Sequence, residues 1–219
     1  MLTTRILTPF SCPSSFFRFV IQTKIDFENR KINDIGNDCL ISVDGTDFAL
    51  AWGAKQIRLS CYKFKGKPGL RYEVGVCLRT SDIVWISGPH YPGLYNDLQI
   101  FRFDLLGMLE PHERVEADDG YIGECPANCK CPNGTTRREN RLRINQLQRS
   151  RHERFNERFM NFGCMNQKFR HSVSKHGLCF DCVAVLTQLS IEHGEVIPYF
   201  NYDDTLTDQD LLPDPWIRL

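Results

Sequence analysis

Short runs of apolar residues, separated by turn residues, dominate the first half of the chain. β-Branched and aromatic residues are frequent at 39–51, 56–64, 70–80 and 82–90, with the turn sequences KGKPG and TSD between the later runs. Runs of this length bounded by glycine, proline and aspartate are typical of β-strands. The pattern predicts an antiparallel meander of three or four strands.

The segment 96–109 has the apolar spacing of an amphipathic helix. Its leucine and phenylalanine side chains recur every three or four residues, and Asn96 or Asp97 is a suitable N-cap. The next segment, at 113–117, predicts a short strand that ends at acids and a glycine. The apolar run Cys39–Val43 ends in the same way, so one arrangement occurs twice in the chain.

Two longer helices are predicted nearer the C-terminus. The first is polar and carries Phe155, Phe159 and Phe162 on one stripe. The second, at 178–193, is apolar and stops at Gly194, a residue favoured just after a helix. Strands followed and interrupted by helices predict an α/β fold.

Composition is that of an ordinary globular protein. The chain has 219 residues, of which 42% are hydrophobic and 25% charged, enough for one well-buried domain. The net charge of zero hides an asymmetry, because 137–175 holds eleven Lys/Arg against three Glu and 192–219 holds seven Asp/Glu against one Arg. The basic stretch suits a polyanionic ligand, and a solvated helix face is the alternative.

The sequence predicts an intracellular protein without a membrane span. No apolar run approaches the roughly 20 residues of a membrane helix, and the first residues do not form a clean signal peptide. The ten cysteines are therefore interpreted as mostly reduced thiols. A zinc site is the alternative, and structural packing is favoured over it; the zinc site would use Cys125, Cys129, Cys131, Cys179 and Cys182.

Acids at the ends of two buried strands, with a glutamate on a later helix, are a pattern that suits Mg²⁺ or Mn²⁺. Carboxylate oxygens are the ligands these ions prefer, and two such ions can activate a nucleophile and stabilise the leaving oxygen of a phosphodiester. An Asp-Gly pair is also a common turn signal, so a turn-only role for Asp44 or Asp118 remains the alternative.

Several motifs in one order resemble the DDE superfamily endonuclease domain of PIF/Harbinger-like transposases. The motifs are SVDGTDF, PGLRYEVGVCLRTSDIVWISGPHYPGLYNDLQIFR, ADDGYIGECP, RSRHERFNERFMNFG, FRHSVSKHGLCFDCVAVLTQLSIEHGE and NYDD, and the resemblance covers about Arg30 to Asp204. It implies an α/β, RNase H-like fold with a mixed sheet, an antiparallel meander plus a parallel strand, flanked by helices. It also implies an N-terminal stub at 1–35, an endonuclease domain at 36–204 and an acidic irregular tail at 205–219.

The resemblance also implies the site. Asp44 of the DG strand, Asp118 of the ADxGY strand and Glu153 of the RHE stretch match the catalytic metal ligands, and Asp97 matches a further acid near the metal. The metal is expected to be Mg²⁺ or Mn²⁺. Nearby acids could replace the chosen ones: Asp47 for Asp44, Asp119 for Asp118 and Glu157 for Glu153.

The implied function is metal-dependent DNA cleavage and strand transfer, with DNA as the partner. On the same helix Arg149, Arg151, Arg154 and Arg158 are expected to contact DNA phosphates, with a solvated face as the alternative. A separate DNA-binding protein and a homodimer stay open, and the location is nuclear or otherwise intracellular. Only about forty residues precede the first catalytic strand. The alternative function is therefore an inactive or domesticated transposase remnant that binds DNA or a protein.

Overall fold

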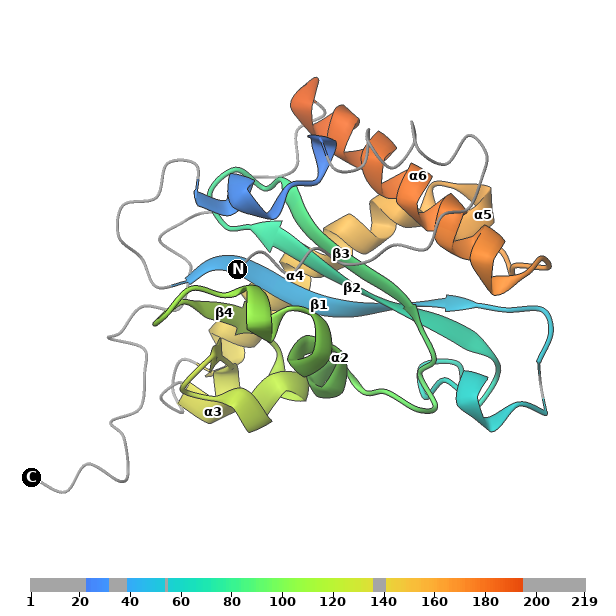
Figure 1. Ribbon diagram of the computed structural model, residues 1–219, viewed down its shortest axis with the longest axis horizontal. Helices are drawn as coiled ribbons and strands as arrows, with labels where there is room; N and C mark the ends of the chain where they lie inside the picture. Colours follow the sequence, from blue (N-terminus) through green and yellow to red (C-terminus); the bar gives the residue numbers. More distant parts are fainter. Residues whose placement is uncertain (1–22, 32–38, 54, 136–140, 195–219) are drawn as a thin grey trace, which may run out of the picture.

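A five-stranded mixed sheet with helices on both faces forms the centre of the molecule (Figure 1). The computed structural model describes residues 23–31, 39–53, 55–135 and 141–194. The strand order is β3-β2-β1-β4-β5, in which β1 to β3 are antiparallel neighbours and β4 and β5 join parallel to β1. The predicted α/β class, with an antiparallel meander plus parallel strands, is confirmed. The strands are β1 Cys39–Ala49, β2 Gly69–Cys77, β3 Ile83–His90, β4 Arg114–Ala117 and β5 Cys129–Lys130.

The helices begin and end where local capping chemistry favours it. Asn96 caps the first of them, because its side chain accepts from the backbone of Gln99 while the Gln99 side chain accepts from Asn96 N–H. The last helix ends before Gly194, whose φ of +85° suits a glycine. The helices are α2 Asp97–Asp104, α3 Pro132–Thr135, α4 Arg141–Met160, α5 Gly163–Asn166 and α6 Val173–Glu192, with short 3-10 helices η1 Phe27–Lys31, η2 Ile57–Leu59, η3 Leu106–Met108 and η4 Asp119–Glu124.

The strand predicted at 56–64 is wrong. The segment contains the short helix η2 and then a series of turns, in which Gly66 N–H donates to Cys61 O at 2.9 Å. Leu59 and Cys61 are buried, so they mimic the alternation of a strand, but Tyr62 is 96% exposed. Tight turns that use a glycine at positive φ replace the ladder that the pattern suggested.

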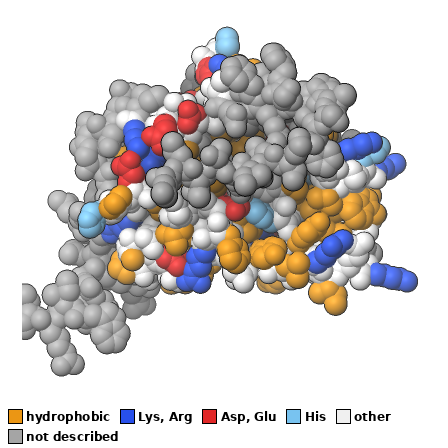
Figure 2. All heavy atoms as spheres, viewed as in Figure 1, with side chains coloured by type: hydrophobic (Ala, Val, Ile, Leu, Met, Phe, Trp, Pro, Cys, Tyr) orange, Lys and Arg blue, Asp and Glu red, His pale blue; other side chains and the backbone are white. Residues whose placement is uncertain are grey.

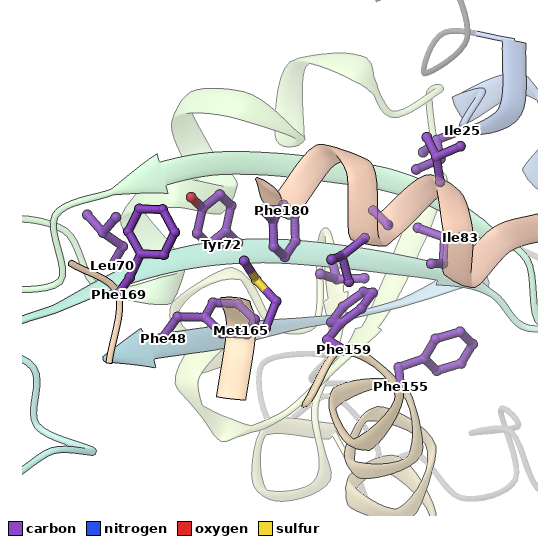
Figure 3. Packing of buried hydrophobic residues seen from close by; sticks show 14 of the residues in the cluster. Ile25, Phe48, Leu70, Tyr72, Ile83, Phe155, Phe159, Met165, Phe169 and Phe180 are labelled. Atoms are coloured by element: carbon purple, nitrogen blue, oxygen red, sulfur yellow. The ribbon is translucent and has the colours of Figure 1, made fainter. Parts of the chain in front are cut away.

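An aromatic core fills the space between the sheet and helices α4 and α6 (Figure 3). Tyr72 stacks on Phe180 with ring centroids 3.9 Å apart, and Phe48 meets both rings edge-on. Phe159 packs against Phe180 from α4. His176 is buried here, with Nδ1 2.8 Å from the Tyr72 hydroxyl, so it packs in the core rather than facing a ligand.

A second, smaller core lies against α2 and η4. Ile41 and Val43 of β1 join Phe101 of α2, Val115 of β4 and Tyr121 of η4, all buried. Successive residues of a strand face opposite sides of a sheet, so β1 serves both cores in alternation. This double burial explains why β1 begins as a continuous apolar run.

The described residues cover the predicted units unequally. Of the predicted stub at 1–35, the structure describes 23–31, while the predicted tail at 205–219 lies outside the described residues. In the described part of the chain, no helix has both the length and the apolar character needed to cross a bilayer.

Candidate active site

Strand β1 passes through Asp44 and Gly45 without turning. Asp44 pairs with Val74 and Gly45 with Glu73 in an unbroken antiparallel ladder. The turn-only interpretation of Asp44 is therefore wrong. Gly45 has a different role, because a Cβ at this position would collide with the carboxylate of Asp97. The glycine lets the first residue of α2 approach the strand closely.

Three aspartates from separate parts of the chain meet beside this glycine. Val43 of β1 pairs with Ala117 of β4 in the parallel ladder, so the next residues lie side by side, Asp44 within β1 and Asp118 just after the end of β4. Asp97 completes the group from α2. A Cβ placed on Gly120 would lie 2.8 Å from Asp118 Oδ1 and 3.6 Å from Asp97 Oδ2, which shows how close these two carboxylates come.

The aspartates are only partly compensated by positive charge. Burial, together with the charges of Asp118 and Asp97, raises the pKa of Asp44 to about 8, although the Gly45 N–H donated at 2.8 Å opposes the shift. Burial also raises the pKa of Asp97, against the effect of Arg71. Oδ1 of Asp97 is buried and 3.1 Å from Nη1 of Arg71, yet it accepts no hydrogen bond from the described residues.

A small hollow of about 30 Å³, room for one water molecule, opens between the acids and α4. His152 lies in it with Nε2 2.8 Å from the buried Ser42 hydroxyl. Burial, together with the charge of Arg151, lowers the pKa of His152 to about 3, so this side chain is neutral at pH 7 and does not offset the acids. The hollow is lined by Ser42, Val43, Asp44, Asp118, Arg149 and His152.

Two of the alternative acids have other partners. Asp47 accepts two hydrogen bonds from Arg71, one on each carboxylate oxygen, at 2.8 and 2.9 Å. Asp119 accepts from the backbone N–H of Asn133 at 2.9 Å and from its side chain, which fixes the start of α3. The acids that face each other are therefore Asp44 and Asp118.

The glutamates of α4 lie further from the aspartates. Glu153 is exposed and is not among the described side chains that line the small hollow. It follows Arg149 by one helical turn, which puts it next to that residue on the helix surface. Glu157 borders a separate hollow of about 540 Å³, together with Arg154 and Arg158.

Arg151 does not belong to the exposed basic face that the sequence suggested. Its side chain is buried and ion-paired with Glu116 of β4, whose side chain is also buried. Arg154 lies on the same side of the helix but is only half-buried, and residue type alone does not reveal this difference. Arg149 is exposed and borders the hollow.

Glu73 is a site neighbour that sequence reasoning missed. It is buried behind Gly45, and it accepts from Trp85 Nε1 at 3.0 Å and from the Tyr121 hydroxyl at 3.3 Å. Burial raises its pKa to about 8. The available signal was an acid within the apolar run 70–78, where an ionisable group needs a partner.

The cysteines of the zinc alternative fall into two groups. The thiol of Cys131 hydrogen-bonds with those of Cys125 and Cys129 in the α2-side core, whereas Cys179 packs against the aromatic core beside Cys164. Among the residues that the structure describes, no group of three or more His, Cys, Asp or Glu side chains is close enough together to hold a metal ion as it stands, and this applies to the three aspartates as well as to the cysteines.

Comparison of the chain with protein-family models, curated proteins and solved structures finds no match. The chemistry of the site is therefore argued from its geometry. Three carboxylates, two of them with raised pKa values, supply the hard oxygen donors that Mg²⁺ and Mn²⁺ prefer. Oδ1 of Asp97, which accepts no hydrogen bond from the described residues, is an oxygen donor of the same kind. In the absence of a cation, the carboxylates repel one another, and this repulsion opposes a tighter grouping.

Proposed function

We propose that the chain is a divalent-metal-dependent DNA endonuclease of the DDE transposase type with an RNase H-like fold. The observation that carries the proposal is the closeness of Asp44 in the middle of β1, Asp97 at the start of α2 and Asp118 just after β4, with too little positive charge around them. The mixed sheet flanked by helices supports it, because the RNase H-like fold has such a sheet.

In this proposal, Asp44, Asp97 and Asp118 hold Mg²⁺ or Mn²⁺, and Glu153 is a further acid at the edge of the site. Bound ions of this kind activate a water or a 3′-hydroxyl and stabilise the leaving oxygen of a phosphodiester. Arg71 fixes Asp97 through its ion pair at 3.1 Å. Arg149, exposed at the hollow, binds the phosphate next to the cleaved bond. A nuclear location belongs to the same proposal.

Nicking of supercoiled plasmid with Mn²⁺, with Mg²⁺ and with EDTA tests the proposal. We expect metal-dependent nicking by the unaltered chain and a loss of at least about a hundredfold in Asp44→Asn, because a ligand is removed. Asp26→Asn is the matched control, since it makes the same chemical change at an N-terminal helix cap. Equal nicking by Asp44→Asn and Asp26→Asn would contradict the proposal.

One observation favours a second function, a DNA-binding remnant without cleavage. The α4 side of the small hollow is formed by Arg149 and His152, while Glu153 is exposed. A chain of this kind would bind DNA in a salt-dependent manner and would not nick it with any metal. Metal-dependent nicking by the unaltered chain separates the two functions, and Glu153→Gln then shows whether Glu153 takes part, because it lowers nicking only if Glu153 is a ligand.

A further inference from the structure

A lysine-edged groove of about 630 Å³ lies at the far end of β1 from the N-terminus. Ala49, Leu50 and Phe64 contribute apolar lining, and the described residues bordering the groove include no acid. The basic residues that border it are Lys63, Lys65, Lys67 and Lys168, and they are called the lysine groove below.

Backbone hydrogen bonds hold the lysine groove in shape. The turn that carries three of the lysines is closed by Gly66 N–H to Cys61 O at 2.9 Å. Lys168 comes from a distant part of the chain, and it is fixed because Phe169 exchanges backbone hydrogen bonds of 2.9 Å with Ala49 and Ala51. The fold therefore brings the four charges together, since Lys168 is separated from the other three lysines by about a hundred residues of sequence.

The lysine groove differs from other exposed lysines in its ion pairing. Lys24 pairs with Glu192 at 2.6 Å, and Lys31 pairs with Glu28 at 2.9 Å. Within the described ranges, none of the four groove lysines has an acid within 4.0 Å. Like charges gathered without internal counter-ions create a local positive potential that favours an external anion.

The lysine groove lies on the same strand as Asp44 of the acid cluster. Strand β1 joins the two places directly, since Ala49 of the groove follows Asp44 by five residues. At about 3.3 Å per residue this is roughly 17 Å, the length of about five base pairs of B-DNA.

Basic side chains project from this side of the molecule. In Figure 1 the connection between β1 and β2 lies at the right, and in the same view Figure 2 shows Lys and Arg side chains standing out at the right next to a hydrophobic area. Tyr62 and Ile57, both strongly exposed, belong to the same connection.

We propose that Lys63, Lys65, Lys67 and Lys168 bind the phosphate backbone of DNA about five base pairs from the position at which the acids act. This inference rests on the proposed function and adds a binding surface on β1 that is separate from the arginines of α4. The groove fixes the length of duplex DNA that the protein contacts on one side of the cleavage point. Contacts to phosphates do not depend on the base sequence.

Binding of a fluorescently labelled duplex of arbitrary sequence, measured by anisotropy over a range of salt concentrations, tests the inference. The Asp44→Asn chain is used without metal, so that cleavage plays no part. Lys63→Ala with Lys65→Ala is expected to weaken binding about tenfold and to lower the slope of log K against log salt by about 1.8, or 0.9 for each lost phosphate contact. The matched double change Lys24→Ala with Lys31→Ala is expected to leave both quantities unchanged.

Two further measurements keep the inference separate from folding and from nuclease activity. Lys63→Arg with Lys65→Arg keeps the charge and should restore binding, and thermal melting should match in all variants. If the lysine-groove alanine pair and the control pair bind DNA with equal affinity and equal salt slope, the inference is overturned. It is also overturned if the groove lysines are needed for binding polyglutamate but the chain does not bind DNA. If the groove variants weaken DNA binding but the unaltered chain never nicks, the nuclease proposal fails and the groove stands.

Discussion

Buried carboxylates occur in two regions of this molecule, and the two regions treat them in opposite ways. Behind η1, Glu113 accepts a two-point hydrogen bond from Arg30 at 2.7 and 3.0 Å, with both side chains buried. Beside Gly45, Asp44 has two other carboxylates as neighbours and one backbone N–H as a donor. The first region stabilises the fold, whereas the second contains carboxyl groups whose ionisation the fold opposes, as the raised pKa values of Asp44 and Asp97 show.

The difference between the two regions indicates which acids have a functional role. A paired buried acid is compatible with a purely structural role, because its partner offsets the cost of burial. A group of under-compensated acids is costly to the folded state, and such cost is typical of functional sites. The distinction separates Asp44 from Asp47, which is three residues away and held by Arg71.

The largest predicted effect is in the paired region. Arg30→Met leaves Glu113 buried without its cation, and we expect a loss of about 3–5 kcal/mol in the free energy of unfolding. Urea denaturation measures it. Lys31→Met is the control, because Lys31 pairs with the exposed Glu110 and should cost less than about 1 kcal/mol. Equal losses in the two variants would remove the basis of the comparison.

A second effect concerns pH. Glu73 has a pKa of about 8 in the folded chain against 4.5 as the ordinary value, so the folded state holds its proton more tightly. Its contribution is fully present below pH 4.5 and is lost as the pH rises towards and through 8. Glu73→Gln should flatten this decline in urea denaturation at a series of pH values.

Glu28 provides a control of opposite sign for the pH measurement. Its hydrogen bond with Lys31 lowers the pKa of this exposed side chain, so any contribution from Glu28 appears above pH 4.5 and is lost as the pH falls. Glu28→Gln should therefore leave the decline between pH 5 and 8 in place. A decline that persists unchanged in Glu73→Gln would show that Glu73 is not its source.

The smallest predicted effect distinguishes neighbouring aspartates. In metal-free buffer, Asp44→Asn should raise the free energy of unfolding by about 1 kcal/mol, because it relieves repulsion among three carboxylates. Asp47→Asn should lower it, because Arg71 loses a two-point partner. Changes of the same sign in both variants would contradict the division into paired and under-compensated acids.

Much of the architecture could be predicted from the sequence, because it depends on local periodicity. The apolar run of β1, the Asn96 cap and Gly194 each act within a few residues. The strand predicted at 56–64 failed because turns at positive φ override alternation. The pairing of Arg151 with Glu116 and the burial of Glu73 could not be predicted, since both depend on which face of a helix or strand meets the sheet interior.

The candidate site shows the same division. Acids at strand ends are visible in the sequence, but the choice of Asp118 over Asp119 depends on Asn133, whose approach is a tertiary event. The lysine groove likewise needs Lys168 to reach a turn about a hundred residues earlier in the chain. Motifs identify the residue types, and the register of β1 with β4 decides which of them meet.

The most direct test of the central claim is the effect of Mn²⁺ on thermal unfolding. At a hundredfold excess over its dissociation constant, a bound ion adds about 2.7 kcal/mol, which raises the melting temperature of a chain of this size by about 5–10 °C. The unaltered chain and Asp119→Asn should both show this rise, and Asp44→Asn and Asp118→Asn should not. A rise of equal size in all four chains, or in none, would contradict a metal site built from Asp44 and Asp118.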